Sequence, residues 1–492
     1  MRTPLVAVTT ALVLAVPATT ATATPAHTRP VTAWLTTGDQ ANLLADRTDL
    51  VGPSDAASPT IAVDPSRRFQ TVEGFGASIT DSSAHLIAKL PGRDRRTLMR
   101  ELFEPRTGLG LSYLRQPIGS SDFVAGEHYT YNDLPAGRTD YQMRHFSIDR
   151  DRKEIIPLLR EARALNPNLK IMASPWSPPA WMKTSGSLVG GRLKDDERVY
   201  RAYAKYLATF VGAYARAGVR IDAITLQNEP QNRTPDGYPG MDLRHDEAIR
   251  LIPLVGRELR AAGLSTELLG YDHNWSLHPN DGGPADDPAN PDYAESLLDD
   301  PTARRWLAGT AFHCYSGDPE RQSRLHDLYP DKDIYFTECS PNQSSDPTTT
   351  FSDTLHWQTR QVTVWGMRHW AKTAIGWNLA LDPSGGPHNG GCATCFGTVT
   401  IDPESGEVTP TAHYYVAGHG SKFLRPGAVR VDSTAYAGSV TGVAFRNPDG
   451  NIVLIAVNDD WGAGEQRFNV TLGARSFSYT LPAGAVATFT LR

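Results

Sequence analysis

The sequence predicts an α/β fold in two parts: a (β/α)₈ TIM barrel and an attached antiparallel β-sandwich built from both ends of the chain. Short apolar runs alternate eight times with longer segments of helical pattern, as in βα units around a parallel sheet. After Pro410 the pattern changes to short strands separated by turn residues. We therefore expect a signal peptide over residues 1–26, an N-terminal arm of the sandwich over 27–68, the barrel over 69–412 and the sandwich over 413–492.

Composition excludes several classes of protein. With 492 residues, of which 40% are hydrophobic and 21% charged, the chain has the composition of a globular protein and not of a disordered one. The formal net charge of −6 and the scattered Lys and Arg residues provide no basic surface for a phosphate backbone. Nucleic acid is therefore not expected as a partner, and we expect a monomer.

The first residues have the pattern of a secretory signal peptide. A positive start at Met1-Arg2 precedes an apolar segment, Leu5–Val16, and a stretch rich in small residues, Pro17–Ala26. No Arg-Arg pair precedes the apolar segment, which favours the general secretory route over the twin-arginine route. No later stretch contains the roughly 18 apolar residues that a membrane span requires. We expect a secreted, extracellular protein without a membrane span.

Eight short apolar runs predict the barrel strands. They are Thr71–Ile79, Gly110–Pro117, Lys170–Pro175, Ile221–Glu229, Glu267–Asp272, Gly309–Tyr315, Asp333–Glu338 and Thr373–Leu381. Between them, segments such as Lys194–Ala217 have the length and amphipathic spacing of crossover helices. The alternative is an open doubly wound sheet, but no Gly-x-Gly-x-x-Gly turn follows the first strand and no P-loop is present, so we favour the closed barrel. In such barrels the active site lies at the C-terminal ends of the strands.

Six further runs predict the sandwich. They are Val429–Ser433, Val440–Arg446, Ile452–Asn458, Gln466–Leu472, Phe477–Leu481 and Ala485–Leu491. The segment Asn447-Pro448-Asp449-Gly450 between two of them is a strong hairpin turn. We expect the apolar run Val31–Leu35 near the N-terminus to complete this domain, which would then brace the barrel.

Two acidic residues stand at the ends of predicted barrel strands. Glu229 ends the fourth run, and Pro230 after it cannot donate to a sheet ladder, so we expect pairing to stop where the acid is presented. Glu338 ends the seventh run. Strands four and seven face one another across a barrel mouth, so the two acids predict glycoside hydrolysis, in which one carboxyl group donates a proton and an ionised one attacks or activates water. The alternative, two unrelated surface acids, does not explain why both lie at strand ends. This chemistry requires no metal and no organic cofactor.

The two carboxyl groups need different protonation states. To act as an acid near neutral pH, Glu229 needs a pKa of ~6–7, and we expect burial and the negative charge of Glu338 to raise it. After glycosylation neutralises Glu338, the pKa of Glu229 should fall, and the same residue then serves as the base.

Several stretches together resemble glycoside hydrolase family 30, the glucosylceramidase-like family. The similar region extends from Gln70 to about Arg425, and the motifs are highly specific when taken jointly. They comprise Phe69–Ser78, Leu114–Gly119, Ser174–Lys183, Gln227–Pro230, the strand that ends at Glu338, and Gly376–Leu381. The resemblance implies a retaining enzyme with a (β/α)₈ barrel and a sandwich formed by both chain ends. It also implies Glu229 as the acid/base and Glu338 as the nucleophile.

The same resemblance implies a sugar pocket. Its implied members are Asp122, Trp176, Asn228, Tyr238, Tyr315 and Trp377, with Arg115 in support. Asn228 can bond the sugar 2-hydroxyl, and Asp122 can accept hydrogen bonds from other hydroxyls. Tyr315 and Arg115 would hold Glu338 ionised and oriented. The alternative for the Trp and Tyr residues is a purely structural role in the barrel core.

The cysteines and His313 have more ordinary interpretations. Cys392 and Cys395 lack the further ligands that a closed zinc site needs, so a small disulfide in the loop after the eighth strand is favoured. Strand alternation points Cys314 and Cys339 away from the barrel interior on adjacent strands, where they either form a disulfide or simply pack. We expect His313 to be a core or rim residue.

The loop after the eighth strand narrows the range of expected substrates. Within the family, Gly385–Val399 resembles the microbial endo-β-1,6-glucanase branch more than the lysosomal glucosylceramidases. Gly240 follows Tyr238-Pro239 at a point where the glucosylceramidase branch has an aromatic residue. We therefore expect a β-1,6-glucanase that acts on β-glucosidic bonds by double displacement. The alternatives are a glucosylceramidase or another exo-β-glucosidase, and a non-catalytic carbohydrate-binding homologue, against which the presence of both acids argues.

Overall fold

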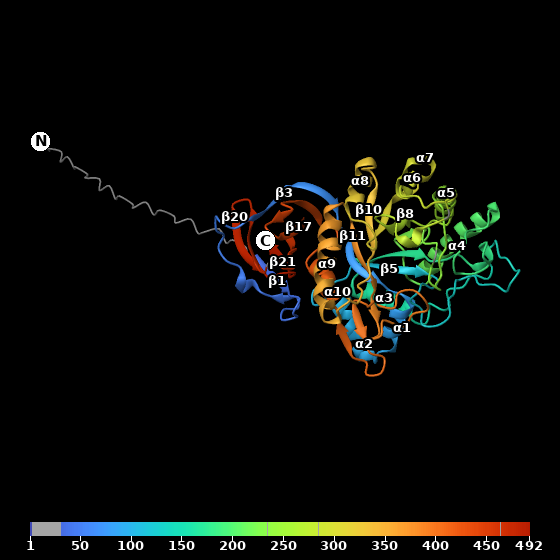
Figure 1. Ribbon diagram of the computed structural model, residues 1–492, viewed down its shortest axis with the longest axis horizontal. Helices are drawn as coiled ribbons and strands as arrows, with labels where there is room; N and C mark the ends of the chain where they lie inside the picture. The colour runs from blue at the N-terminus through green and yellow to red at the C-terminus, as the bar shows by residue number, and fades with distance from the viewer. Residues whose placement is uncertain (2–30, 234, 284, 463) are drawn as a thin grey trace.

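Two domains lie side by side in the protein (Figure 1). The computed structural model describes residue 1 and residues 31–492, apart from 234, 284 and 463. The signal peptide predicted over residues 1–26 lies outside the described residues, except for residue 1. In the described part of the chain, no helix combines the length and the apolar character needed to cross a membrane.

Eight parallel strands form the barrel, hydrogen-bonded in the order β10-β9-β8-β7-β6-β5-β4-β11. Their bounds are β4 Gly74–Ser78, β5 Tyr113–Ile118, β6 Lys170–Pro175, β7 Ala223–Thr225, β8 Glu267–Asn274, β9 Leu307–His313, β10 Asp333–Glu338 and β11 Thr373–Asn378. The two ends of this path meet through a parallel bridge between Ile334 and Ala371. The predicted barrel is confirmed, the open doubly wound sheet is wrong, and each of the eight predicted runs overlaps one of these strands.

Helices surround the barrel on its outer face (Figure 1). Their bounds are α1 Asp81–Lys89, α2 Gly92–Phe103, α3 Ile155–Leu165, α4 Glu197–Arg216, α5 His245–Ala261, α6 Tyr293–Asp299, α7 Pro301–Arg304, α8 Glu320–Leu328, α9 Thr350–Gln358 and α10 Ala412–Ser421. Helix α4 illustrates their origin: the side chain of Asp196 caps its first turn, and Tyr203, Leu207 and Tyr214 belong to its buried face. Helix α9 continues into a π-helical segment, Thr359–Gly366, that leads toward β11.

Side chains fill the barrel in layers. An apolar plug takes one residue from each of seven strands: Tyr113, Met172, Ala223, Leu269, Ala311, Tyr335 and Ile375. Because side chains alternate along a strand, the next inward positions lie two residues further toward the C-terminal ends. These buried positions hold Arg115, Ser174, Thr225, His313, Thr337 and Trp377. A mostly polar layer therefore lies directly above the apolar plug.

The second domain combines both ends of the chain in one ten-stranded sheet, in the order β2-β1-β21-β18-β17-β15-β3-β19-β20, with β16 beside β17. The strands are β1 Val31–Thr36, β2 Ala45–Asp46, β3 Thr60–Thr71, β15 Val429–Ser433, β16 Tyr436–Ala437, β17 Val440–Arg446, β18 Ile452–Asn458, β19 Gln466–Leu472, β20 Arg475–Leu481 and β21 Val486–Leu491. The N-terminal strand β1 pairs antiparallel with the C-terminal strand β21, which confirms the predicted use of both ends. The β3–β19 pair is parallel, in contrast to the antiparallel pairs around it.

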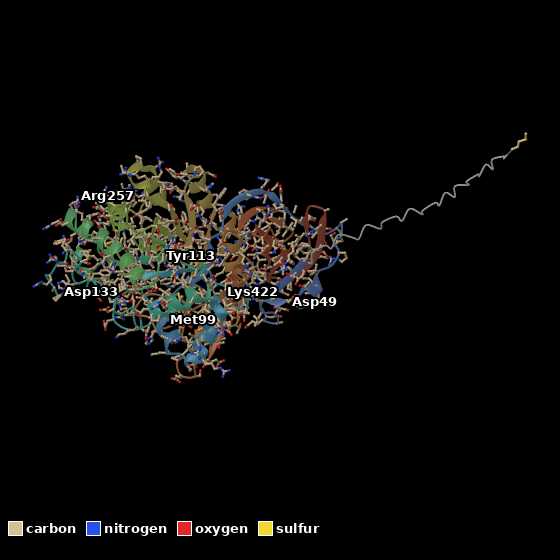
Figure 2. The ribbon with its side chains drawn as sticks, turned by 180° about the vertical axis from the view of Figure 1, so that it is seen from behind. Asp49, Met99, Tyr113, Asp133, Arg257 and Lys422 are labelled. Atoms are coloured by element: carbon tan, nitrogen blue, oxygen red, sulfur yellow. A yellow bond between two sulfur atoms is a disulfide. The ribbon has the colours of Figure 1, made fainter. Side chains whose placement is uncertain are left out.

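Helices α9 and α10 and the long strand β3 lie between or across the two domains (Figure 1). Arg368, just after the π-helical segment, donates hydrogen bonds to the carbonyl oxygens of Gly442 (2.6 Å) and Ser433 (3.2 Å) in the sheet domain. Lys422, which follows α10, lies 5.8 Å from the ring centroid of Trp34 in β1, and Figure 2 shows it at this junction. Side chains at the ends of barrel helices therefore attach the sheet domain to the barrel.

Candidate active site

A cavity of ≈ 340 Å³ opens at the C-terminal ends of the barrel strands. Eight of the residues predicted for the site line it: Asp122, Trp176, Asn228, Glu229, Tyr238, Tyr315, Glu338 and Trp377. The ninth, Arg115, is fully buried in the polar layer and contacts the carboxylate of Glu338. The structure therefore brings all nine residues together, from segments that are far apart in the sequence.

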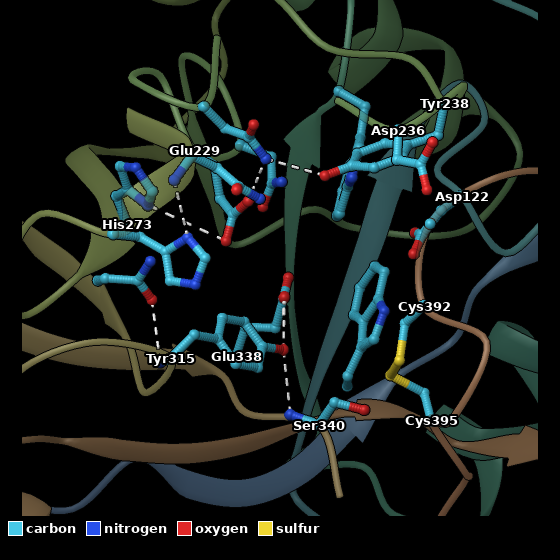
Figure 3. A pocket seen from close by; sticks show the side chains of 18 of the residues that line it. Asp122, Glu229, Asp236, Tyr238, His273, Tyr315, Glu338, Ser340, Cys392 and Cys395 are labelled. Carbon is cyan, nitrogen blue, oxygen red and sulfur yellow. Dashed lines mark hydrogen bonds and ion pairs between the residues drawn. A yellow bond between two sulfur atoms is a disulfide. The ribbon is translucent and has the colours of Figure 1, made fainter. Parts of the chain in front are cut away.

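Glu338 is the last residue of β10 and is buried. The pairing of β10 with β9 shifts register between Phe336 and Glu338, so strict alternation ends here and both Thr337 and Glu338 reach the barrel centre. The Arg115 guanidinium donates to Oε2 of Glu338. The Tyr315 hydroxyl donates to Oε1 at 2.8 Å (Figure 3). These contacts fix the orientation of the carboxylate.

Glu229 is presented differently from the prediction. Strand β7 ends at Thr225, so the expectation that pairing continues to the acid is wrong. The backbone of Glu229 instead adopts the left-handed region, with φ of 46°, which a residue with a side chain rarely occupies outside functional sites. Its amide donates to the carbonyl of Asp272 at 3.0 Å, and its Oε2 accepts from the Asn232 amide at 3.1 Å. The turn directs the carboxylate over the barrel centre.

Asp272 is a site residue that the sequence analysis missed. The pairing of β8 with β9 shifts between Tyr271 and His273, and the backbone of Asp272 is left-handed, which turns its side chain inward. Its carboxylate accepts hydrogen bonds from Arg115 Nη2 (2.9 Å), Ser174 Oγ (2.7 Å), Thr225 Oγ1 (2.8 Å), Thr337 Oγ1 (2.8 Å) and His313 Nε2 (3.0 Å). Burial alone would raise the pKa of Asp272, but the charge of Arg115 and these donors hold it far below its usual range.

His313 is fully buried, as expected of a core residue, but its ring lies among three carboxylates. Nε2 is 3.0 Å from Asp272, and Nδ1 is 3.4 Å from Oε1 of Glu229 and 4.0 Å from Glu338. Burial opposes protonation of the ring, yet the charge of Glu338 and the hydrogen bonds to Asp272 and Glu229 raise the pKa of His313 to about 9. The assignment to core or rim therefore missed its place between the two predicted catalytic acids.

The expected rise in the pKa of Glu229 is wrong for the ligand-free protein. Burial favours the neutral acid, but the hydrogen bond from His313, the charges of His273 and His313 and the Asn232 amide together lower the pKa of Glu229 to about 2. The available proton therefore resides on His313, at hydrogen-bond distance from the carboxylate that would donate it.

Two tryptophans and a polar cluster shape the other side of the cavity. The rings of Trp176 and Trp377 are stacked, with centroids 5.0 Å apart, and Arg115 lies over both. The side-chain oxygen of Asn228 accepts from Arg115 at 2.7 Å, which leaves its NH₂ group available to a ligand. Burial, followed by the charge of Glu338, raises the pKa of Asp122 to about 8, so this carboxyl group is a donor as well as an acceptor at neutral pH.

Both pairs of cysteines form disulfides. Cys314–Cys339 joins the residues that directly follow β9 and β10, with Cα atoms 5.4 Å apart, and it ties together the strands that end in His313 and Glu338. Cys392–Cys395 closes the tip of a loop that lines the cavity (Figure 3). The zinc alternative for the latter pair is thereby wrong.

The loop that carries Cys392 and Cys395 is packed tightly against the pocket. Gly391 has φ of +74°, and a side chain there would meet Asp122, with a Cβ only 2.6 Å from the Asp122 Cβ. Oδ1 of Asn342 lies 3.3 Å from the sulfur of Cys392 and 3.1 Å from that of Cys395. Glycine is therefore required where this loop meets the sugar pocket.

Among the described residues, Glu229, His313 and Glu338 are close enough together to be considered as metal ligands. One oxygen or nitrogen atom from each lies within 4.8 Å of the other two. A ring nitrogen that carries a proton is a donor and cannot ligate a metal, and the carboxylates around His313 keep it protonated. The same distance places an oxygen of Glu229 within 4.8 Å of an oxygen of Glu338. The arrangement suits chemistry by two carboxylates better than it suits a metal.

Comparison with known families agrees with this geometry. The model of the glycosyl hydrolase family 30 TIM-barrel domain matches residues 72–424, and the model of the glycosyl hydrolase family 30 beta sandwich domain matches residues 427–489. Together these two models cover the barrel and the C-terminal part of the sheet domain.

Individual relatives support the same relationship. An endo-1,6-beta-D-glucanase of Neurospora crassa is 32% identical over 430 residues, covering 85% of this chain and 84% of that protein. Putative glucosylceramidase 1 of Caenorhabditis elegans is 29% identical over 456 residues, covering 87% of this chain and 82% of that protein. A solved endo-beta1,6-glucanase superposes with a TM-score of 0.82 at 30% identity, covering 94% of this chain and 100% of the other.

Proposed function

The chain belongs to glycosyl hydrolase family 30, and we propose that it is a secreted β-1,6-glucanase that retains the anomeric configuration of its substrate. The observation that carries the mechanism is the pair Glu229 and Glu338, whose facing oxygens lie within 4.8 Å. Retaining enzymes hold their two carboxyl groups about 5–5.5 Å apart, whereas inverting enzymes leave a gap of about 6.5–9.5 Å for a water molecule. The short separation favours a covalent glycosyl-enzyme.

In the first step, Glu338 attacks the anomeric carbon and the bond from that carbon to the leaving oxygen breaks. The Nδ1 proton of His313, 3.4 Å from Glu229, moves to Glu229 and from there to the leaving oxygen, so that Glu229 is left ionised and His313 neutral. Asp272 holds the other ring nitrogen of His313, so the imidazole keeps its orientation as its charge changes. The leaving group departs as a neutral alcohol.

In the second step, water attacks the same carbon from the face that the leaving group vacated. Glu229 accepts a proton from the water and returns it to His313, which restores the starting state, and the bond to Glu338 breaks to release the sugar. Arg115 and Tyr315 contact Glu338 throughout, and they stabilise the carboxylate that leaves. Each carbon–oxygen bond that forms is matched by one that breaks, with net consumption of one water.

The lining of the cavity favours a sugar leaving group over a lipid. Beyond the predicted site residues, further polar residues line the cavity: Asn274, His278, Asn280, Asp281 and Asn342. A ceramide chain would leave these groups without water or partners, whereas hydroxyl groups can bond to them. The names of the fungal and solved endo-β-1,6-glucanases point to the same class of substrate. Glucosylceramide remains the second candidate, because the Caenorhabditis elegans relative carries that activity in its name.

Product analysis tests this function. The mature protein is incubated with linear β-1,6-glucan and, separately, with detergent-dispersed glucosylceramide, with Glu338→Gln as the inactive control. We expect short β-1,6-linked oligosaccharides from the glucan and no product from the control. Release of glucose and ceramide alone, without cleavage of the glucan, would reject the β-1,6-glucanase and establish the second candidate.

Export of the protein is part of the same proposal. The apolar N-terminal segment has the signal-peptide pattern, and the two disulfides suit an oxidising compartment. Fractionation of the producing cells, with N-terminal sequencing of the exported form, tests it: we expect the protein in the medium, shortened near residue 26. Retention of the full chain inside the cell would contradict export.

A further inference from the structure

A second depression adjoins the catalytic cavity. It has a volume of ≈ 460 Å³ and shares four lining residues with that cavity: His278, Tyr315, Ser340 and Asn342. Tyr315 binds Glu338 through its hydroxyl, which also accepts a hydrogen bond from the amide of Ser340 at 3.0 Å. The two depressions therefore meet at the wall that holds the nucleophile.

Trp357 on α9 lines the second depression, and 42% of its surface is exposed. The apolar C–H face of a sugar ring stacks on an exposed indole ring of this kind. Asn342, Ser344 and Asp353 line the same depression and provide hydrogen-bonding groups for hydroxyls. One aromatic surface surrounded by short polar side chains is suited to a sugar ring and unsuited to an alkyl chain.

The depression lies on the side of the leaving group. Figure 3 shows Asp122 and Tyr238 on one side of Glu338, and His273 and Tyr315 on the other. The first side, with its stacked tryptophans, encloses the sugar that Glu338 attacks. The part of the substrate beyond the scissile bond must then extend past Tyr315 and His278, toward Trp357.

We propose that Trp357 is a stacking surface for a sugar ring of the glucan chain on the leaving-group side, and that this subsite makes the enzyme act on chains in preference to single glucosides. The inference deepens the proposed function and rests on it. Asn342 lines both the cavity and the subsite, and its backbone forms an antiparallel bridge with Cys395 of the Cys392–Cys395 loop. The occupant is a β-1,6-linked glucosyl unit of the leaving group, beyond the unit whose oxygen departs.

Kinetics on two substrates test the subsite. Trp357→Ala is compared with the wild type on a β-1,6-gluco-oligosaccharide of about six units and on 4-nitrophenyl β-glucoside, whose single aryl group does not extend to Trp357. We expect kcat/KM for the oligosaccharide to fall by about tenfold, the size of one lost stacking contact, while kcat/KM for the aryl glucoside stays within about twofold of the wild type.

Trp461→Ala is the matched control. Trp461 is also an exposed tryptophan, and its ring contacts His356 of α9 with a centroid distance of 4.3 Å, but it does not line either depression. This variant should match the wild type on both substrates, which separates loss of the stacking surface from disturbance of α9.

The outcomes distinguish this inference from the proposed function. Equal activity of Trp357→Ala and wild type on the oligosaccharide would overturn the subsite and leave the β-1,6-glucanase intact. Equal losses on both substrates would also overturn it, because the effect would then lie in the catalytic cavity. Hydrolysis of the aryl glucoside by the wild type without any cleavage of the oligosaccharide would overturn the inference and the proposed substrate together.

Discussion

At the scale of single residues, the protonation of Glu229 and His313 is the feature that the sequence did not reveal. Two-carboxylate chemistry required a protonated Glu229, and burial beside Glu338 suggested how its pKa would rise. In the structure His313 accepts that role, since its pKa is raised to about 9 while that of Glu229 is lowered to about 2. In the free enzyme the proton is therefore on His313, and the carboxylate of Glu229 that delivers it lies at hydrogen-bond distance.

Removal of the Glu229 side chain tests its assignment as acid/base. We expect Glu229→Ala to lower kcat on substrates with poor leaving groups by about 10²–10⁴-fold, the usual contribution of a general acid or base. Added azide should then restore part of the turnover and yield a glucosyl azide, because a small anion can attack the glycosyl-enzyme without a base. If azide restores nothing in a correctly folded variant, Glu229 is not the acid/base.

The pH dependence tests the part played by His313. Below about pH 9 the ring is protonated in the free enzyme, so the proton supply is lost as pH rises through that value, and the alkaline limb of kcat/KM should lie near pH 9. In His313→Gln, Glu229 loses the donor and the charge that lower its pKa and must hold the proton itself. The alkaline limb should then move to lower pH by more than about one unit.

The measurement is kcat/KM for an aryl β-glucoside across the pH range, with circular dichroism to establish that the variant is folded. A variant that is merely destabilised would lose activity at all pH values without a displaced limb. An alkaline limb at the same pH in wild type and His313→Gln would show that the ring does not store the proton.

At the scale of elements, the sequence predicted where each barrel strand lies but not where its alternation fails. If every second side chain points inward, the positions after Tyr335 and Leu269 are Thr337 in β10 and Tyr271 and His273 in β8. Strict alternation therefore points Glu338 and Asp272 outward. Register shifts in β10 and β8 turn both side chains into the barrel. Such bulges depend on pairing with the neighbouring strand, which a single sequence does not specify.

The polar layer of the barrel is the feature of the sequence from which Asp272 could have been predicted. Ser174, Thr225, His313 and Thr337 each lie two residues after an apolar plug residue of the same strand. Four polar inward residues at one level require a common buried partner, because unpaired polar groups in a core are costly. That reasoning would have led to a buried charge at the centre of the barrel, which is Asp272 bound to Arg115.

The disulfide between β9 and β10 yields a prediction at this scale. Cys314 and Cys339 are separated by 25 residues, and closing a loop of that size lowers the entropy of the unfolded chain. The double variant Cys314→Ser/Cys339→Ser should lose about 3 kcal/mol of stability, measured by denaturant unfolding. Cys392 and Cys395 lie only three positions apart in the sequence, so their double variant should lose less stability. Equal losses in the two variants would contradict the loop-length argument.

At the scale of the whole molecule, the pattern of the sequence specified two domains and their order along the chain. The change from βα alternation to short strands after Pro410 located the second domain, and a lone apolar run near the N-terminus indicated that the first strand returns to it. The contacts that join the domains were not predictable, because they come from single side chains such as Arg368 and Lys422 on the barrel side.

Arg368 provides the test at this scale. Its guanidinium donates to the carbonyls of Gly442, Ser433 and Thr434, and it is largely buried between the domains. Arg368→Met leaves these acceptors without their donor, which should cost about 1–3 kcal/mol and lower the apparent Tm in calorimetry. Arg324→Met, at an exposed arginine of α8, is the control and should change the apparent Tm little. An unchanged apparent Tm in Arg368→Met would show that the domains do not depend on this contact.

A covalent sugar on Glu338 is the most direct test of the two-carboxylate mechanism. A 2-deoxy-2-fluoro-β-glucoside with a good leaving group slows the second step, so the glycosyl-enzyme accumulates, and mass spectrometry of the intact protein and its peptides locates the label. We expect one fluoroglucosyl group per chain, on the peptide that contains Glu338, and none on Glu338→Gln. A label on Glu229, or turnover of the substrate without any covalent label and with inversion of the anomeric centre, would contradict the assignment.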